Sequence, residues 1–296
     1  DTDRSRGLGD VYKRQLLNIL RQISMFGIVV VGYTMVMISG GCDMSVGGQL
    51  ALCGMFAATL NVTYGLPTFV VVILTLMLGA LFGLINGLLM NVFNIMPLIV
   101  TLGTMLFFQG ASYIISGGVA IFGLSDSFKF IGQGYLGFVP LPIVILLVIG
   151  VLGYIVLHKT YFGRQIYAMG GNPEAARLAG VNIKKYRLAV FTITGILAAV
   201  AGIIMAARTG SAQPSAGASY PFDCMTAVVL GGVSFAGGSG SMLGAMMGVI
   251  IIGVLNNGMQ LIGMDSNMIN CVKGIVLLIA IGIDSVQRTG KKAKKV

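Results

Sequence analysis

The sequence predicts an all-α protein that crosses a membrane many times, and three observations support this fold class. Of the 296 residues, 56% are hydrophobic and only 9% are charged, whereas a soluble domain carries about a quarter charged residues. The mean hydropathy is +0.93. Apolar segments recur along the chain, and a hydrocarbon core of about 30 Å needs about 20 apolar residues at 1.5 Å each. These properties exclude a soluble globular enzyme and a disordered chain.

Nine apolar segments are candidate membrane spans, although glycines interrupt several of them. In chain order they are 23–40, 48–66, 68–91, 97–117, 139–158, 187–207, 222–236, 241–262 and 268–286. The segment 222–236 is the least secure, with a half-helix as the alternative. Connections are short except 118–138, which is aromatic and expected outside, and 159–186. We therefore expect residues 16–296 to form one transmembrane domain.

Two glycine series predict where these helices pack closely. Gly79, Gly83 and Gly87 recur at every fourth residue, and Gly244 and Gly248 repeat that spacing. Small residues at this spacing let two membrane helices approach until their backbones touch. Both series are thus expected to be helix contacts.

The basic residues gather in two polar islands and predict the orientation of the chain. The formal net charge is +10, and 11 of the 19 basic residues lie in 158–187 and in the tail 287–296. Positive loops remain on the cytoplasmic side, so both islands and the C-terminus are expected in the cytoplasm. Basic clusters beside apolar runs anchor a protein at lipid headgroups, and a nucleic-acid partner is excluded.

The N-terminal residues do not fit this orientation. Five candidate spans separate Arg21 from the loop 159–186, and this odd number places Arg21 on the extracytoplasmic side. Basic residues are disfavoured there. We therefore expect residues 1–15 to be a non-native or disordered leader without packed contacts, and one more apolar span to precede Leu16 in the natural protein.

A complete short helix is predicted within the loop 159–186. Asn172 can cap the free N–H groups, Pro173 suits the first helical position and Glu174 favours the positive end of the helix dipole. Gly180 can adopt the left-handed stop. The segment is Asn172, Pro173, Glu174, Ala175, Ala176, Arg177, Leu178, Ala179 and Gly180. Its small, smooth surface favours docking of a partner over mere ordering of the loop.

Polar side chains at membrane depth are candidates for a translocation path, because burying them costs free energy. The candidates are Asp43, Asn86, Gln109, Asp223, Asn256 and Asn257. The three amides Gln109, Asn256 and Asn257 suit hydrogen bonding to a neutral polyhydroxyl solute. Structural roles remain open, since Asp43 or Ser45 can cap the next helix and Asn86 lies within a glycine series. Lys273, in the last span, is expected to extend its ammonium toward the membrane surface.

No catalytic constellation occurs in the sequence. There is no nucleophile beside a base, no metal-ligand cluster and no carboxylate pair. The glycine-rich run 231–240 lacks the lysine of a phosphate-binding loop. We expect no enzymatic activity, no metal and no cofactor on this chain.

Several motifs in one order resemble a known family. They are GGCDMSVGG (40–48), PLIVTLGTM (97–105), FGRQIYAMGGNPEAARLAGVNI (162–183), GSAQPSAG (210–217), AVVLGGVSFAGGSGSMLGA (227–245) and GVLNNGMQLIGM (253–264). Over about Leu16 to Gln287 the chain resembles the permease subunit of bacterial ABC sugar importers of the ribose, galactoside and xylose class. Two departures concern the sugar: Gln109 stands where relatives often have Arg, and Pro221-Phe222-Asp223 where they often have Glu-Leu-Asp.

The resemblance implies a multi-pass protein of the bacterial cytoplasmic membrane with ten spans, one more than the nine counted above. It implies that the segment from Asn172 to Gly180 is the coupling helix that docks on an ATPase subunit, which uses ATP and Mg. It also implies pairing with a second permease copy and delivery of a monosaccharide by an extracytoplasmic binding protein.

Three other classes of transporter are the alternatives. A related ABC permease for branched-chain amino acids shares the architecture. A secondary transporter needs a titratable pair to couple ions, for which only Asp43 and Asp223 are candidates. A passive channel needs polar rings, which the sequence lacks.

Overall fold

The computed structural model describes the backbone of residues 2–293 and the side chains of residues 19–286. This part of the chain forms twelve α-helices and four two-residue strands. The helices are α1 Thr2–Ile38, α2 Val46–Val62, α3 Thr68–Phe93, α4 Pro97–Ser116, α5 Asp126–Gln133, α6 Leu141–Lys159, α7 Tyr161–Gly171, α8 Pro173–Leu178, α9 Ile183–Thr209, α10 Tyr220–Leu230, α11 Met242–Leu261 and α12 Ser266–Ala293. The strands are β1 Ile121–Phe122, β2 Tyr135–Leu136, β3 Val139–Pro140 and β4 Ser211–Ala212.

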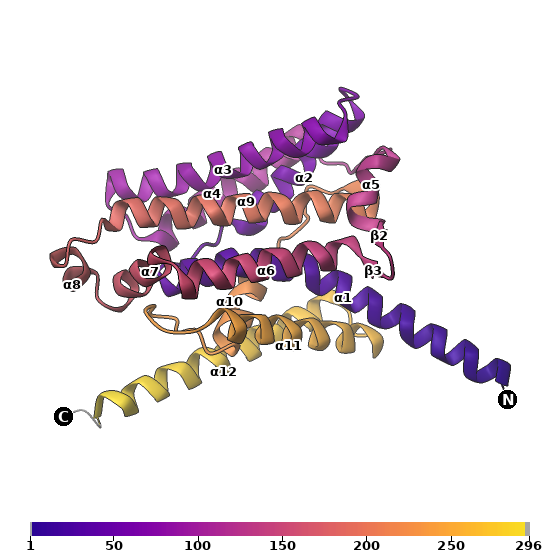
Figure 1. Cartoon of the computed structure of the whole chain (residues 1–296). Coiled ribbons are helices and arrows are strands. Elements are labelled where there is room, and N and C mark those ends of the chain that lie inside the picture. Colours follow the sequence, from indigo (N-terminus) through magenta and orange to yellow (C-terminus); the bar gives the residue numbers. More distant parts are fainter. Residues whose placement is uncertain (1, 294–296) are drawn as a thin grey trace.

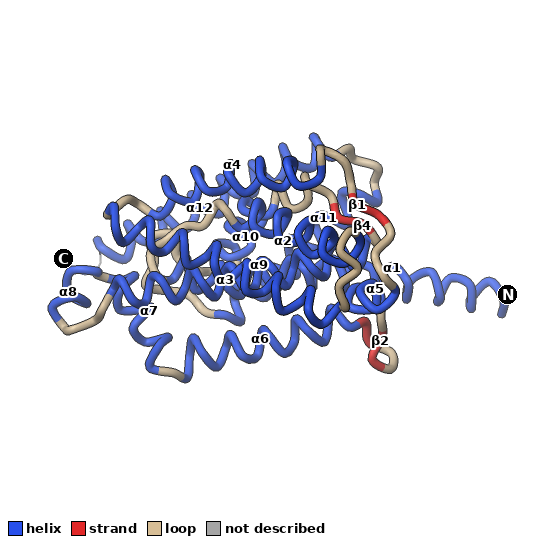
Figure 2. Tube along the Cα trace, turned by 90° about the horizontal axis from the view of Figure 1, so that it is seen from above, coloured by secondary structure: helices blue, strands red, loops and turns tan. Residues whose placement is uncertain are grey.

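The long helices lie side by side in one bundle (Figure 1). Helix α9 is at its centre and packs against α1, α2 and α3, while α1 also contacts α6, α10 and α11. The strands lie at one end of the bundle, where β1 pairs with β4 (Figure 2). The prediction of an all-α, polytopic membrane protein is confirmed.

Seven of the described helices are long and apolar enough to cross a membrane. The other two expected segments, 48–66 and 222–236, form the shorter apolar helices α2 and α10. Helix α10 has 11 residues, about 16 Å at 1.5 Å per residue, or half of a hydrocarbon core of about 30 Å. This length agrees with the expectation that 222–236 is the least secure span.

Both predicted glycine series are helix contacts. A methyl group at Gly83 would overlap the Phe191 carbonyl of α9, and Gly79 and Gly195 meet in the same way one turn further along. Gly248 of α11 lies equally close to the Ala227 carbonyl of α10. Only glycine permits such separations between helix backbones.

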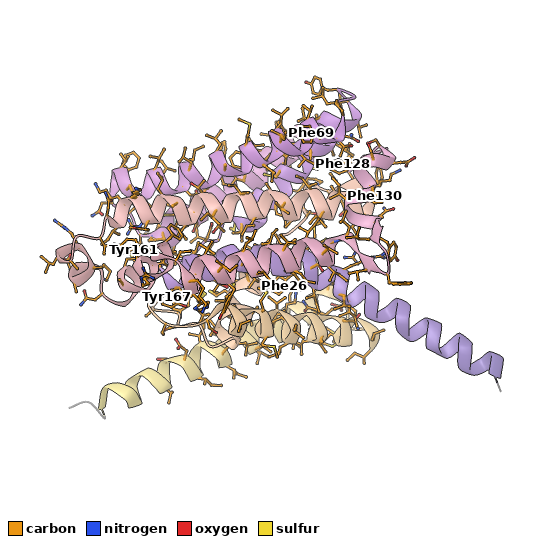
Figure 3. The ribbon with its side chains drawn as sticks, viewed as in Figure 1. Phe26, Phe69, Phe128, Phe130, Tyr161 and Tyr167 are labelled. Atoms are coloured by element: carbon orange, nitrogen blue, oxygen red, sulfur yellow. The ribbon has the colours of Figure 1, made fainter. Side chains whose placement is uncertain are left out.

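The outer faces of the bundle are apolar. Figure 3 shows Phe69 of α3 on the outside, whereas Phe128 of α5 is fully buried. Exposed leucine, isoleucine and phenylalanine side chains also cover α4, α6 and α11. An apolar patch this extensive marks a membrane or protein contact.

The two ends of the bundle differ in the way that the charge pattern predicts. Helices α7 and α8 and the described end of α12 lie at one end, and α5, β2 and β3 lie at the other (Figure 1). The Arg21 guanidinium stacks over the Tyr135 ring of β2 at 4.8 Å, and therefore lies opposite Arg164 of α7. Helix α1 continues along its axis toward the N-terminus. The contacts expected to be absent from residues 1–15 lie outside the described side chains.

Candidate functional site

Two apolar helices begin inside the bundle rather than at its ends. We call residues 39–45, between α1 and α2, the first interruption, and residues 210–219, between α9 and α10, the second interruption. A methyl group at Gly48, in the first turn of α2, would lie 2.9 Å from the Met105 carbonyl in the middle of α4. The two interruptions also touch, because Gly47 lies against the Gly217 carbonyl. Helices broken at mid-membrane form the binding sites of many transporters.

The first interruption holds a closed polar cluster around Ser45. The Ser45 hydroxyl donates to Asp43 Oδ1 and accepts from Gln49 Nε2 at 2.6 Å and from Asn86 Nδ2 at 2.8 Å. The Ser45 backbone N–H also donates to Asp43 Oδ1, at 2.9 Å. All four residues are fully buried. The hydroxyl uses its one donor and both acceptor positions, so it joins three elements at one atom.

This cluster brings together two predicted residues, Asp43 and Asn86. Sequence reasoning missed Ser45 as the hub and Gln49 as its partner, although their spacing of four places them on one helix face. Asp43 Oδ2 and Asn86 Oδ1 have no hydrogen-bond partner among the described residues. The capping role expected for Asp43 or Ser45 is wrong, because no described side chain caps the first turn of α2. Asp43 Oδ1 accepts instead from the backbone N–H of Ser45, the residue before the helix, and thereby fixes the turn that leads into α2.

The second interruption is held by α4. Gln109 Nε2 and Ser112 Oγ both donate to the Pro214 carbonyl, at 3.0 and 2.9 Å. The segment after β4 is thereby kept beside the middle of α4. The structure thus gives Gln109 a positioning contact, and Ser112 was missed in the sequence.

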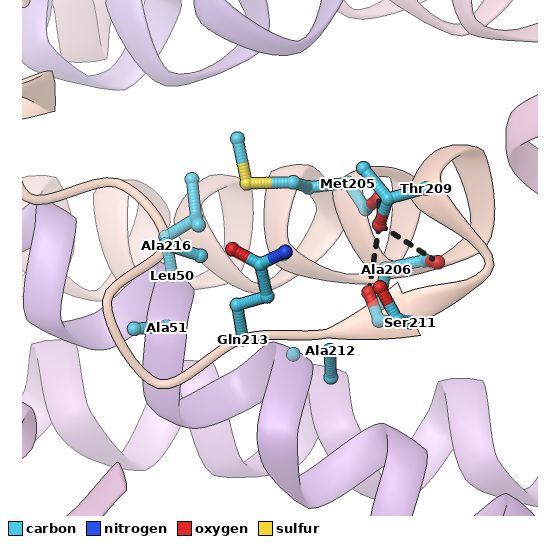
Figure 4. A pocket seen from close by; sticks show the side chains of 11 residues that line it. Leu50, Ala51, Met205, Ala206, Thr209, Ser211, Ala212, Gln213 and Ala216 are labelled. Carbon is cyan, nitrogen blue, oxygen red and sulfur yellow. Dashed lines mark hydrogen bonds between the residues drawn. The ribbon is translucent and has the colours of Figure 1, made fainter. Parts of the chain in front are cut away.

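A cavity of about 150 Å³ separates this segment from α2 and α9. Figure 4 shows the Gln213 side chain extending toward Met205, with Thr209 bonded to its own helix and to the Ser211 carbonyl. The lining includes Leu50, Ala206 and Ala216. This cavity offers little polar chemistry to a ligand.

Asp223 forms a buried ion pair in the first turns of α10. Lys273 Nζ of α12 lies 2.9 Å from Asp223 Oδ2, and the Ser219 hydroxyl donates to the same oxygen at 3.0 Å. The two charged side chains are 15% and 8% exposed. The expectation that Lys273 extends toward the membrane surface is wrong, because a carboxylate inside the bundle neutralises its ammonium more effectively than a distant headgroup.

The ion pair lies on two adjoining cavities. The larger has a volume of about 680 Å³ and the smaller about 240 Å³, and Ser219, Asp223, Gln260 and Lys273 line both. Asn256 lines the smaller cavity, and its Oδ1 has no hydrogen-bond partner within the described part of the chain. Asn257 lines neither cavity. Of the predicted path residues, the structure therefore brings Asp223 and Asn256 together and leaves Asn257 apart.

The predicted short helix is α8, at the end of the bundle. The Asn172 side chain caps it by accepting from the Ala175 N–H at 3.1 Å, with Pro173 at the first position. Gly180 has φ +85 and stops the helix. Ala176 faces inward, whereas Leu178 is 88% exposed. The capping prediction is confirmed, and an apolar side chain is presented at the tip of the molecule.

Helix α7, which precedes α8, was not predicted. Thr160 caps it by accepting from the Gly163 N–H at 3.3 Å, and this threonine was the available signal. The Tyr167 hydroxyl donates to the Gly240 carbonyl at 2.8 Å, and burial raises the pKa of Tyr167. Helix α7 therefore fixes α8 to the loop between α10 and α11.

Three chain segments meet through glycine at this end. Gly170 of α7 touches the Ile38 carbonyl, and the Gly238 N–H donates to that same carbonyl at 2.8 Å. Gly237 packs against Gly40 of the first interruption. We call these four glycines and Ile38 the glycine junction. It connects α8, through α7, to the start of the first interruption by backbone contacts.

A match to a protein family covers most of the chain. Residues 15–281 match the family described as branched-chain amino acid transport system / permease component. The chain belongs to this permease family. It is therefore a multi-pass membrane protein with a transport role. No solved structure matches it.

Curated relatives of this permease include sugar transport proteins. The ribose import permease protein RbsC of Bacillus subtilis is 42% identical over 91% of this chain and 84% of its own length. The galactose/methyl galactoside import permease protein MglC of Haemophilus influenzae is 36% identical over 93% and 87%. The xylose transport system permease protein XylH of the same organism is 34% identical over 92% and 89%.

Proposed function

We propose that this permease is the membrane-spanning subunit of an ATP-driven importer and gives the translocation path for a monosaccharide. The observation that carries this proposal is identity of 34–42% over more than nine-tenths of the chain with permeases named for ribose, xylose and galactose. The uncharged amides and the neutralised ion pair inside the bundle support a neutral polyhydroxyl cargo. The family is described as a branched-chain amino acid permease component, so transport of branched-chain amino acids is the competing function.

The coupling surface in this proposal is α8 with its cap and stop. Asn172, Pro173, Glu174 and Gly180 shape the helix, and Ala175, Arg177 and Leu178 face outward for an ATPase subunit, with Ala176 as the inward anchor. The basic loop 159–186 and the described end of α12 lie at the same end as α8 (Figure 1), so we assign that end and the C-terminus to the cytoplasm. The membrane is then the inner membrane of a bacterium.

The remaining partners act outside this chain. A second permease copy completes the complex, an extracytoplasmic binding protein delivers the sugar, and the ATPase hydrolyses ATP with Mg. Within the described side chains, no three metal-binding groups come together. In this proposal the permease itself contributes the path, and the catalysis takes place on the ATPase subunit.

Reconstitution in vesicles tests the proposal. With its ATPase and binding protein, the permease should accumulate ribose, xylose or galactose only when ATP is supplied. Alone it should neither hydrolyse ATP nor accumulate sugar. Uptake by the permease alone under a proton gradient would reassign it as a secondary carrier, and ATP-driven uptake of leucine without sugar uptake would favour the amino-acid alternative.

The coupling role of α8 has a separate test. Leu178→Asp places a charge at the exposed tip and should abolish copurification of the ATPase while membrane insertion continues. Ala176→Pro should do the same by breaking the helix, at a cost of about 3 kcal/mol or more. Phe138→Asp is the matched control, because Phe138 is 96% exposed at the other end of the bundle. A complex that assembles and transports with both α8 variants contradicts the assignment.

A further inference from the structure

We propose that the two cavities around Asp223 and Lys273 form the sugar-contact site of the path, in which this ion pair supplies hydrogen bonds to the hydroxyls of an uncharged monosaccharide. The inference rests on the proposed function and deepens it by assigning residues to the site. Lys273 and Gln260 are new to the path, and Asp43 and Asn86 are left outside it.

The ion pair retains hydrogen-bonding capacity that the protein does not use. Both the Ser219 hydroxyl and Lys273 Nζ bond to Asp223 Oδ2, so neither engages Oδ1. An ammonium has three donors, and Asp223 is the hydrogen-bond partner of Lys273 among the described residues. Asn256 adds an unpartnered buried oxygen at the smaller cavity. A sugar hydroxyl both donates and accepts, and matches such a mixed set.

The volume and charge of the cavities fit this class of ligand. Pockets for small molecules measure about 300–1,000 Å³, and the larger cavity has about 680 Å³. Among its described lining residues, the charged ones are Asp223 and Lys273, which compensate each other. Asn270 and Ser266 add neutral polar groups to the wall. In the larger cavity a neutral solute therefore meets oriented donors and acceptors without a net charge, whereas Arg208 adds a positive charge to the wall of the smaller cavity.

The location of the Asp223–Lys273 ion pair also argues against a purely structural role. Ionisable side chains inside a membrane protein are rare, pair with one another and mark substrate and ion pathways. A second ion pair, Lys129 with Asp126 at 3.3 Å, lies within the short helix α5, where the Asp126 side chain is fully exposed. It is the surface pair with which the pair of Asp223 and Lys273 can be compared. The pair of Asp223 and Lys273 joins α10 to α12 at the wall of a cavity large enough for a sugar.

The experiment uses the full complex in vesicles, with ribose, xylose and galactose as probes at saturating binding protein. The test variant is the double substitution Asp223→Asn with Lys273→Met, which leaves no unpaired charge. Uptake per ATP hydrolysed should fall at least tenfold, and the ranking of the three sugars should change. Lys129→Met is the matched control and should leave both unchanged.

A third variant keeps the proposal testable if the double variant fails to fold. Asn270 is exposed to the larger cavity and separate from the ion pair, so Asn270→Leu should assemble normally and lower uptake at least threefold with a changed ranking. If the double variant assembles and transports like the wild type, or if Asn270→Leu leaves rate and ranking unchanged, the contact site is wrong while the proposed function stands. Absence of ATP-driven uptake of all three sugars by the wild type overturns both.

Discussion

The two interruptions are built from similar parts and differ in what surrounds them. Each precedes a short apolar helix that starts inside the bundle, and an aspartate lies near each helix start. In the first, Asp43 is enclosed and receives N–H and hydroxyl groups of its own turn. Next to the second, Asp223 of α10 faces a lysine from another helix and a cavity of about 680 Å³. An intramembrane aspartate therefore does not identify a path until its partners are known.

The different surroundings predict different roles for the two interruptions, one in the stability of the protein and the other in its selectivity for the solute. The residues of the Ser45 cluster are fully buried and line neither cavity of the ion pair, so the first interruption is expected to govern folding. Polar side chains that line a cavity can form hydrogen bonds with a solute. The second interruption is therefore expected to determine which solute is transported.

The largest expected effect comes from removing the hub of the closed cluster. Ser45→Ala should destabilise the protein by about 2–4 kcal/mol, because the buried amides of Gln49 and Asn86 no longer have their shared acceptor. Thermal unfolding in detergent measures the change. Ser215→Ala is the control in the second interruption, where the serine is exposed, and should unfold like the wild type. Equal midpoints of thermal unfolding for Ser45→Ala and Ser215→Ala would contradict the claim that the first interruption contributes more to stability than the second.

A smaller effect is expected where the two interruptions touch. Gly47→Ala inserts a methyl group against the Gly217 carbonyl, and such overpacking costs about 1–3 kcal/mol. Gly103→Ala, which meets no atom within 4 Å, should be neutral or stabilise α4 by about 0.5–1 kcal/mol. If Gly47→Ala unfolds like Gly103→Ala, the interruptions are not in contact.

Gln109 tests whether the tether of the second interruption is also a sugar contact. Gln109→Ala removes one of two bonds to the Pro214 carbonyl and should cost about 1 kcal/mol. The ranking of ribose, xylose and galactose should stay the same, because Ser112 still holds the loop. A changed ranking at normal stability would move Gln109 from the tether into the path.

The smallest effect is expected at Asn257, next to a residue that lines the smaller cavity. Asn257→Ala should change stability by less than about 0.5 kcal/mol and leave uptake unchanged. Asn256→Ala should lower uptake, since Asn256 lines that cavity. Equal uptake by the two variants would show that lining the smaller cavity does not make a residue important for transport.

Local features of the fold were predictable from the sequence because they depend on neighbouring residues. The cap of Asn172 and the stop at Gly180 require only residues within one or two turns. The close approach at Gly83 follows from a regular spacing. Seven of the nine expected spans coincide with described helices that are long and apolar enough to cross a membrane. The other two, α2 and α10, are shorter because each starts inside the bundle.

The site was less predictable because its partners are distant in sequence. Lys273 and Asp223 are 50 residues apart, and Asn86 reaches Ser45 across 41 residues. Hydropathy marks each polar residue as unusual but does not say which two meet. The assignment of Asp43, Asn86, Gln109 and Asn257 to a path therefore stays a prediction, which the transport assays of Gln109→Ala and Asn257→Ala test for two of the four residues.

The glycine junction limits how the sequence of this permease can change. At most contacts a substitution is absorbed by neighbouring side chains that adopt another rotamer. A methyl group at Gly170 would meet the Ile38 carbonyl and the Gly238 nitrogen, which are backbone atoms and have no rotamer to change. A relative with a larger residue at the position of Gly170 must therefore have a different backbone path at the segment that corresponds to the end of α1.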